Sequence, residues 1–123
     1  MKRDMDLIRQ ILLRVEASPP FEHIFASNML VDGYNRDEII YHVVQLIDAG
    51  LLVGKVMSTM DGGAPECVVT AMTWEGHEFI DAARADTVWN AAKAQAKKMA
   101  GSLTFGAMKT LLIAEAAKLL GSR

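Results

Sequence analysis

The chain has 123 residues, of which 51% are hydrophobic and 23% are charged, a balance typical of a globular protein rather than of a disordered one. Its single cysteine, Cys67, excludes an intramolecular disulfide and any metal site built from several cysteines. No apolar run approaches the roughly 18 residues that a transmembrane helix needs, so we expect a cytoplasmic protein that does not enter the membrane.

The net charge of −2 is unevenly distributed along the chain. Residues 1–85 hold seven Lys or Arg against thirteen Asp or Glu, a net charge of −6, whereas residues 86–123 hold six against two, a net charge of +4. Such asymmetry can mark a surface that meets a partner, although short domains often show it by chance. We expect a first domain over residues 1–85 and a C-terminal helical extension over residues 86–123.

The first predicted element is a helix over residues 4–16. Apolar residues recur there at three- and four-residue spacing, and the Ser-Pro-Pro sequence at 18–20 stops the helix because proline lacks an amide hydrogen. The segment 21–31 is ambiguous. Either residues 23–25 or residues 28–31 could add a short strand to a sheet.

The second predicted element is a helix from Asn35 to Ala49. Asn35 and Glu38 have the spacing of a capping box, in which each side chain accepts a hydrogen bond from the backbone of the other residue. At the other end, Gly50 can take the left-handed position after the helix, and Leu51 then supplies the hydrophobic contact of a Schellman motif.

A β-hairpin and a third helix follow. Two β-favouring runs, 52–58 and 67–72, are separated by a cluster of turn residues at 61–65, a loop too long for a two-residue turn. Thr73 is a suitable N-cap for the next helix, which we expect to carry Trp74, Phe79 and Ile80 inward. Helix, hairpin and helix in this order predict an α+β fold, namely a winged helix-turn-helix-like domain whose wing is the hairpin.

The helix that starts after Thr73 either continues or bends near residues 86–87, and ends by Gly101. A last helix is predicted over residues 104–120. We expect both tryptophans, Trp74 and Trp89, to anchor the core rather than to stack on bases, because neither lies in a basic run.

Three sequence motifs, MKRDMDLIRQIL, YHVVQLIDAGLL and TWEGHEF, together span much of the chain. With them the chain resembles a family of short, uncharacterised bacterial and prophage proteins that is catalogued as a domain of unknown function. The resemblance implies a winged-helix-like fold and frequent occurrence in mobile elements. It implies no reaction.

The helix at 35–49 would be the recognition helix of a winged helix that reads DNA. Its candidate DNA-contacting residues include the types that pair with base edges. They are Asn35, Arg36, Tyr41, His42 and Gln45. Carboxylates share this helix face, and the hairpin tip at 59–66 holds no Lys or Arg, which is unfavourable opposite phosphate. We therefore place a core-forming helix with a solvated acidic face ahead of DNA reading, which stays the alternative.

Basic residues elsewhere could form a cationic surface remote from that helix. They are Lys2, Arg3, Arg9, Lys93, Lys97 and Lys98. The simpler interpretation is that these side chains lie on ordinary solvated helix faces, which we favour for scattered lysines.

The last helix is apolar around much of its circumference, and such a helix is normally buried. One small domain offers limited surface to cover it, so we expect self-association into a homodimer, with a second protein as a possible partner. The residues that we expect at the contact are Met108, Leu111, Leu112, Leu119 and Leu120. The alternative is a monomer in which the C-terminal helices fold back on the first helix.

Catalytic or metal-binding chemistry finds little support in the sequence. The three histidines, His23, His42 and His77, do not have the spacing of metal ligands, and Cys67 lies in a predicted strand without a neighbouring motif. We expect a non-catalytic protein without a cofactor or metal.

Overall fold

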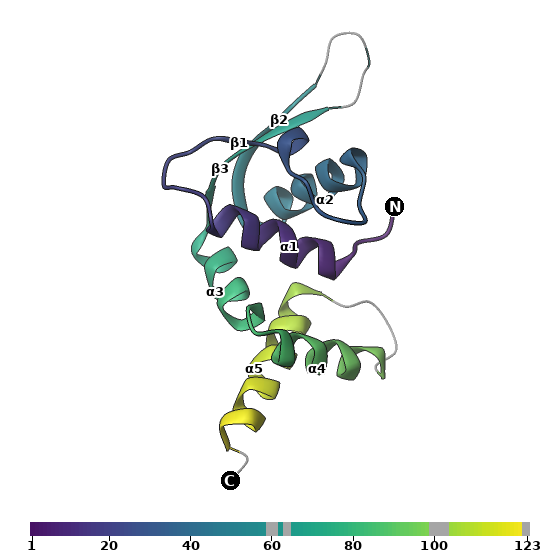
Figure 1. The fold of residues 1–123 in the computed structure, drawn as a ribbon, viewed down its shortest axis with the longest axis vertical. Helices are drawn as coiled ribbons and strands as arrows, with labels where there is room; N and C mark the ends of the chain where they lie inside the picture. Colours follow the sequence, from purple (N-terminus) through teal and green to yellow (C-terminus); the bar gives the residue numbers. More distant parts are fainter. Residues whose placement is uncertain (59–61, 63–64, 99–103, 122–123) are drawn as a thin grey trace. The chain divides into compact units, whose positions relative to one another are not determined.

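The computed structural model describes residues 1–58, 62, 65–98 and 104–121, without the side chains of residues 120 and 121. The chain forms two compact units, Met1–His77 and Glu78–Arg123 (Figure 1). The described residues hold five α-helices and a three-stranded antiparallel sheet, which confirms the predicted α+β class. The boundary that we expected between residues 85 and 86 lies further along the chain than the division between these units.

In the first unit, helix α1, Met5–Glu16, begins at a side-chain cap. The Asp4 carboxylate accepts hydrogen bonds from the backbone N–H groups of Asp6 and Leu7 at 3.0 and 3.2 Å. An acidic cap satisfies donors that no helical carbonyl reaches, and it lies at the positive end of the helix dipole. The helix buries an apolar stripe that consists of Leu7, Ile8, Ile11 and Leu12.

Helix α2, Arg36–Asp48, has both predicted caps. The Glu38 N–H donates to Asn35 Oδ1 at 2.9 Å, and the Asn35 N–H donates to Glu38 Oε1 at 3.0 Å, which completes the capping box. Gly50 has a φ of +82°, and the N–H of Leu51 donates to the carbonyl of Leu46 at 3.0 Å, as in a Schellman motif. The two ends of α2 are therefore set by local sequence.

The sheet contains β1, Ile24–Phe25, β2, Leu52–Met57, and β3, Glu66–Met72, with β3 in the centre. Both neighbours run antiparallel to β3, and a bulge interrupts the β2–β3 register at residues 53–54. Of the two predicted positions for the extra strand, the earlier one is confirmed. A short 3₁₀ turn, η1, Ala26–Asn28, follows it, and α1 and α2 pack on each other and against the sheet (Figure 1).

Helix α3, Trp74–Ala83, starts at the end of the sheet. The Thr73 hydroxyl accepts a hydrogen bond from the Gly76 N–H at 3.0 Å and donates to the Gly50 carbonyl at 2.6 Å, so Thr73 caps α3 as predicted and also ties it to the end of α2. The prediction that Trp74 points inward is wrong, because its side chain is 78% exposed. The buried stripe of α3 follows Gly76, Phe79 and Ile80, and Trp74 lies on another face.

The second unit is built from the end of α3 together with α4, Asp86–Lys97, and α5, Phe105–Gly121. The helix is interrupted between α3 and α4, so of the two predicted alternatives the structure has the bend. Phe79 meets Trp89 and Phe105 in edge-to-face contacts, with ring centroids 6.5 and 5.3 Å apart. Trp89 is buried as expected, and α4 and α5 pack on each other (Figure 1).

Candidate functional site

The candidate DNA-contacting residues all lie on α2 or at its cap, but they differ in exposure. Asn35 and Arg36 are exposed, Tyr41 and Gln45 are partly buried, and His42 is buried. The Asn35 side-chain oxygen is occupied by the capping box, so it is engaged within the protein.

Both ring nitrogens of His42 are engaged within the first unit. Nε2 accepts a hydrogen bond from the Asp4 N–H at 2.9 Å, and Nδ1 lies 2.7 Å from the Glu38 carbonyl oxygen. Because a carbonyl can only accept, Nδ1 carries the proton in this arrangement. His42 is 1% exposed and so does not face a ligand. We counted His42 among the DNA-contacting candidates from the sequence, although its spacing of three from Ile39 and four from Leu46 continues the buried stripe.

A tyrosine extends this network, which we call the Asp4 joint and which consists of Asp4, Tyr34, Glu38 and His42. The Tyr34 hydroxyl donates to Asp4 Oδ2 at 2.7 Å. That hydrogen bond, helped by burial and by nearby carboxylates, raises the pKa of Tyr34 to about 12. The joint connects the start of α1 with the start of α2, so these polar groups serve the fold.

A second polar cluster ties η1 to β3. The Glu66 carboxylate accepts hydrogen bonds from the Ser27 hydroxyl, from the Ser27 N–H at 3.1 Å and from the Cys67 N–H at 2.9 Å. Burial alone would raise the pKa of Glu66, but these hydrogen bonds, with the Arg36 charge, outweigh it and lower the pKa. The neighbouring thiol of Cys67 is buried, and burial together with the Glu66 charge raises its pKa, which disfavours the nucleophilic thiolate.

The candidate basic residues are divided between the two units. Lys2, Arg3 and Arg9 belong to the first unit, where Arg9 is buried and the other two are exposed. In the second unit, Lys97 and Lys98 are exposed, and Lys93 is partly buried.

The structure divides the predicted self-association residues of α5. Met108 and Leu112 are fully buried, Leu111 is partly buried, and Leu119 is 56% exposed; the side chain of Leu120 lies outside the described part. Met108 and Leu112 are four residues apart and face inward on successive turns, so their side chains pack within this chain and are covered there.

Part of the surface that α5 leaves exposed, called the α5 face below, consists of uncharged residues that we did not predict at the contact. They are Thr110, Ile113, Ala114 and Ala117. Ile113 is 55% exposed and also lines a mainly apolar groove of about 560 Å³ between α3 and α5. Sequence reasoning chose the larger side chains and missed this face. Its signal in the sequence is that residues 110, 113, 114 and 117, which share one side of a helix, carry no charge.

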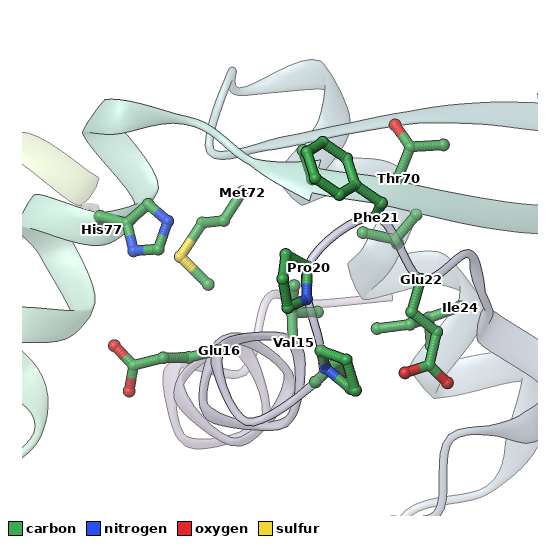
Figure 2. A pocket seen from close by; sticks show the side chains of 13 residues that line it. Val15, Glu16, Pro20, Phe21, Glu22, Ile24, Thr70, Met72 and His77 are labelled. Carbon is green, nitrogen blue, oxygen red and sulfur yellow. The ribbon is translucent and has the colours of Figure 1, made fainter.

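The first unit contains a cavity of about 330 Å³, called the Phe21 cavity below. It lies between the end of α1, the segment 18–22, and β3 with the residues that follow (Figure 2). Its apolar walls include Val15, Ile24 and Met72. Its volume is at the lower end of the range for small-ligand pockets.

Phe21 at the rim of this cavity was not predicted as a site residue. Its side chain is 94% exposed, and its φ of +66° is in the left-handed region that bulky residues rarely occupy. An exposed aromatic ring directly after two prolines, between two regular elements, is the sequence signal that could have drawn attention to it.

Among the residues that the structure describes, no cluster of His, Cys, Asp and Glu could hold a metal ion. Within the same residues, no helix is long and apolar enough to cross a bilayer.

Comparison with known proteins places the chain in a family. The profile of the family described as "Hypothetical protein (DUF2513)" matches residues 2–102. The chain belongs to this family. It is also 34% identical over 112 residues to an "Uncharacterized protein" of Haemophilus influenzae, a match that covers 89% of this chain and 90% of that relative. No solved structure shows a significant match. These matches confirm the resemblance to a family of unknown function.

Proposed function

We propose that this chain is a non-catalytic, self-associating interaction protein whose first unit has a winged-helix-like fold. The order α1-β1-η1-α2-β2-β3, with β3 between its two neighbours, supports the fold assignment. Helix α2 takes the position of a recognition helix and the β2–β3 hairpin that of a wing. The helix that would precede α2 is reduced to the turn η1. The sequence resemblance implies frequent occurrence in mobile elements, and an accessory or regulatory role there belongs to the same proposal.

The observation that carries self-association is the α5 face. Its four residues are exposed and uncharged, and three of them are Thr or Ala, which allow two helices to approach closely. Next to this face, Lys109 pairs with Glu78 at 3.4 Å and Lys118 with Glu115 at 3.2 Å. Because these charges are compensated within the chain, two such faces meet without like-charge repulsion. A second copy is therefore the occupant that fits, through a symmetric contact.

The test is the oligomeric state of two matched variants in analytical ultracentrifugation. Ala114→Glu places a carboxylate on the α5 face, whereas Ala94→Glu places one on an exposed position of α4. We expect wild type and Ala94→Glu to sediment as dimers and Ala114→Glu as a monomer. A wild-type protein that stays monomeric at high concentration refutes self-association.

DNA binding is the second candidate function, and the position of α2 favours it. Arg36 is exposed at the start of the helix and Gln45 lies further along it, and both residue types read bases. The exposed carboxylates of Asp37 and Asp48 on the same helix act against it, since they repel phosphate. A gel shift with duplex DNA at low salt, steeply weakened by added salt and by Arg36→Ala, would support this function. Unshifted DNA at low ionic strength would exclude it.

A further inference from the structure

The residues of the α5 face have the spacing of a hole that receives one side chain of a facing helix. Thr110, Ile113, Ala114 and Ala117 stand at positions i, i+3, i+4 and i+7 of α5, and all four are exposed. In helix pairs with knobs-into-holes packing, four residues on one side of a helix surround each side chain that the partner helix inserts. Three of the four residues here have short side chains, which leaves the hole open.

The same face supplies a side chain that fits such a hole. Ile113 is the large apolar residue among the four, and it is 55% exposed. Leu119 is similarly exposed, at 56%, but its place six residues further along directs it to a different side of α5. Covering Ile113 is therefore the main apolar gain that this face can obtain.

The order of large and small residues favours an antiparallel pair of α5 helices. In a symmetric contact, residue i of one copy faces residue j of the other and residue j faces residue i. With the two-fold axis between residues 113 and 114, Ile113 faces the partner's Ala114, and Thr110 faces the partner's Ala117. Each larger side chain then meets a smaller one, as close packing requires. In a parallel pair Ile113 would face its own copy, and the alanines would face each other across a gap.

Electrostatics favour the same direction. Antiparallel helices place the positive end of one helix dipole beside the negative end of the other. The nearest charged side chains, Lys109 and Lys118, lie on opposite flanks of the face and are paired with Glu78 and Glu115. The antiparallel register brings Lys109 to the level of the partner's Lys118, but on the opposite flank. The charges therefore surround the contact as a polar rim.

We infer that two copies of this chain join through antiparallel α5 helices, and that Ile113 of each copy inserts into the hole formed by the α5 face of the other. The inference rests on the self-association proposed above, to which it adds the direction, the register and the anchoring side chain. Because each copy both fills and offers one hole, the contact closes on itself as a dimer, and a third copy cannot join through the same face.

Cysteine trapping determines the direction of the helices in the full chain. In the antiparallel pair, Thr110→Cys of one copy lies opposite Ala117→Cys of the other. Two cysteines at position 110 would then be seven residues apart along the helices, about 10 Å, which exceeds the Cα separation of about 7 Å that a disulfide can span. In a glutathione redox buffer, a mixture of the two variants should yield the mixed disulfide as its main cross-linked product, identified by mass spectrometry. Wild type, whose single cysteine Cys67 is buried, should stay uncross-linked.

A matched pair of variants tests the anchoring side chain by analytical ultracentrifugation. Ile113→Ala should raise the dissociation constant of the dimer about ten- to hundredfold, because each dimer loses two large side chains from its centre. Leu119→Ala removes an equally exposed apolar side chain from a different side of α5 and should leave the dimer unchanged. Circular dichroism verifies that each variant is folded.

Three results would overturn this inference while the protein still sediments as a dimer. They are a disulfide of each cysteine variant with itself, which indicates parallel helices, the absence of any cross-link, and equal effects of Ile113→Ala and Leu119→Ala. Each of them leaves the proposed self-association in place. A wild-type protein that sediments only as a monomer refutes both proposals, so the two failures are distinguished by the same measurement.

Discussion

Replacing Phe21 with glycine should stabilise the protein although it removes a large apolar side chain. The left-handed backbone at φ +66° costs a bulky residue about 1–2 kcal/mol, and glycine is free of this cost. Glycine also loses more backbone entropy on folding, which reduces this gain by about 0.5–1 kcal/mol. Because 94% of the phenylalanine surface is already exposed, its removal forfeits little burial. The net gain in the free energy of unfolding is about 0.5–1 kcal/mol.

A gain of this size raises the melting temperature by about 2–4 °C for a domain of this length. Thermal unfolding measures this shift, and urea unfolding measures the free energy directly. Phe21→Ala is the matched control, since alanine removes the ring but keeps the Cβ atom that makes the left-handed conformation unfavourable. It should be close to wild type in stability. If Phe21→Gly is no more stable than Phe21→Ala, the backbone at this position is not strained and the reasoning fails.

Three further predictions concern packing and protonation. A Cβ atom at Gly76 would collide with the carbonyl oxygen of Leu51, so Gly76→Ala should lower the free energy of unfolding, measured with urea, by more than about 2 kcal/mol. Gly106→Ala on α5, where a Cβ atom meets no close neighbour, should be neutral or stabilising, and equal effects of the two changes would contradict the close packing at Gly76. Because folding raises the pKa of Tyr34 to about 12, the contribution of Tyr34 to stability is complete below about pH 10 and is lost as the pH rises toward 12. Tyr34→Phe should abolish that alkaline loss. If the free energy of unfolding of wild type and variant depends on pH in the same way above about pH 10, the result argues against the hydrogen bond to Asp4. Folding lowers the pKa of Glu66, so wild type should have a higher free energy of unfolding than Glu66→Gln above about pH 4.3. This difference should shrink as the pH falls through the folded-state pKa. A difference that does not depend on pH would contradict the role of the carboxylate charge.

The features that sequence predicted well are those set by neighbouring residues. The capping box of Asn35 and Glu38 and the left-handed Gly50 depend on residues within one or two helical turns, so their spacing in the sequence is sufficient evidence. The α+β class follows from the same local signals, because helix, hairpin and helix each carry their own pattern.

The features that sequence missed are set by contacts between distant residues. Trp74 is large and apolar, which favours burial, but its place on α3 relative to Gly76 and Phe79 directs it outward. His42 is polar and was expected at the surface, yet the Asp4 backbone, far away in sequence, supplies the partner that allows its burial.

The candidate site was harder to predict than the fold for the same reason. The apolar content of α5 indicated a contact, but the division of its residues between core and surface depends on how α4 and α3 cover it, which hydrophobicity alone does not give. The Phe21 cavity is assembled from α1, β3 and a loop, so no single sequence motif contains it.

The Asp4 joint has a consequence for how the first unit unfolds. Helix ends usually fray independently, because their first amide groups have few partners. Here the cap of α1 also holds Tyr34 and His42, which lie just before and within α2. Opening the first turn of α1 therefore also releases the hydrogen bonds that Asp4 forms with Tyr34 and His42. In hydrogen exchange the N-terminal amides of the two helices should open together, as one cooperative unit.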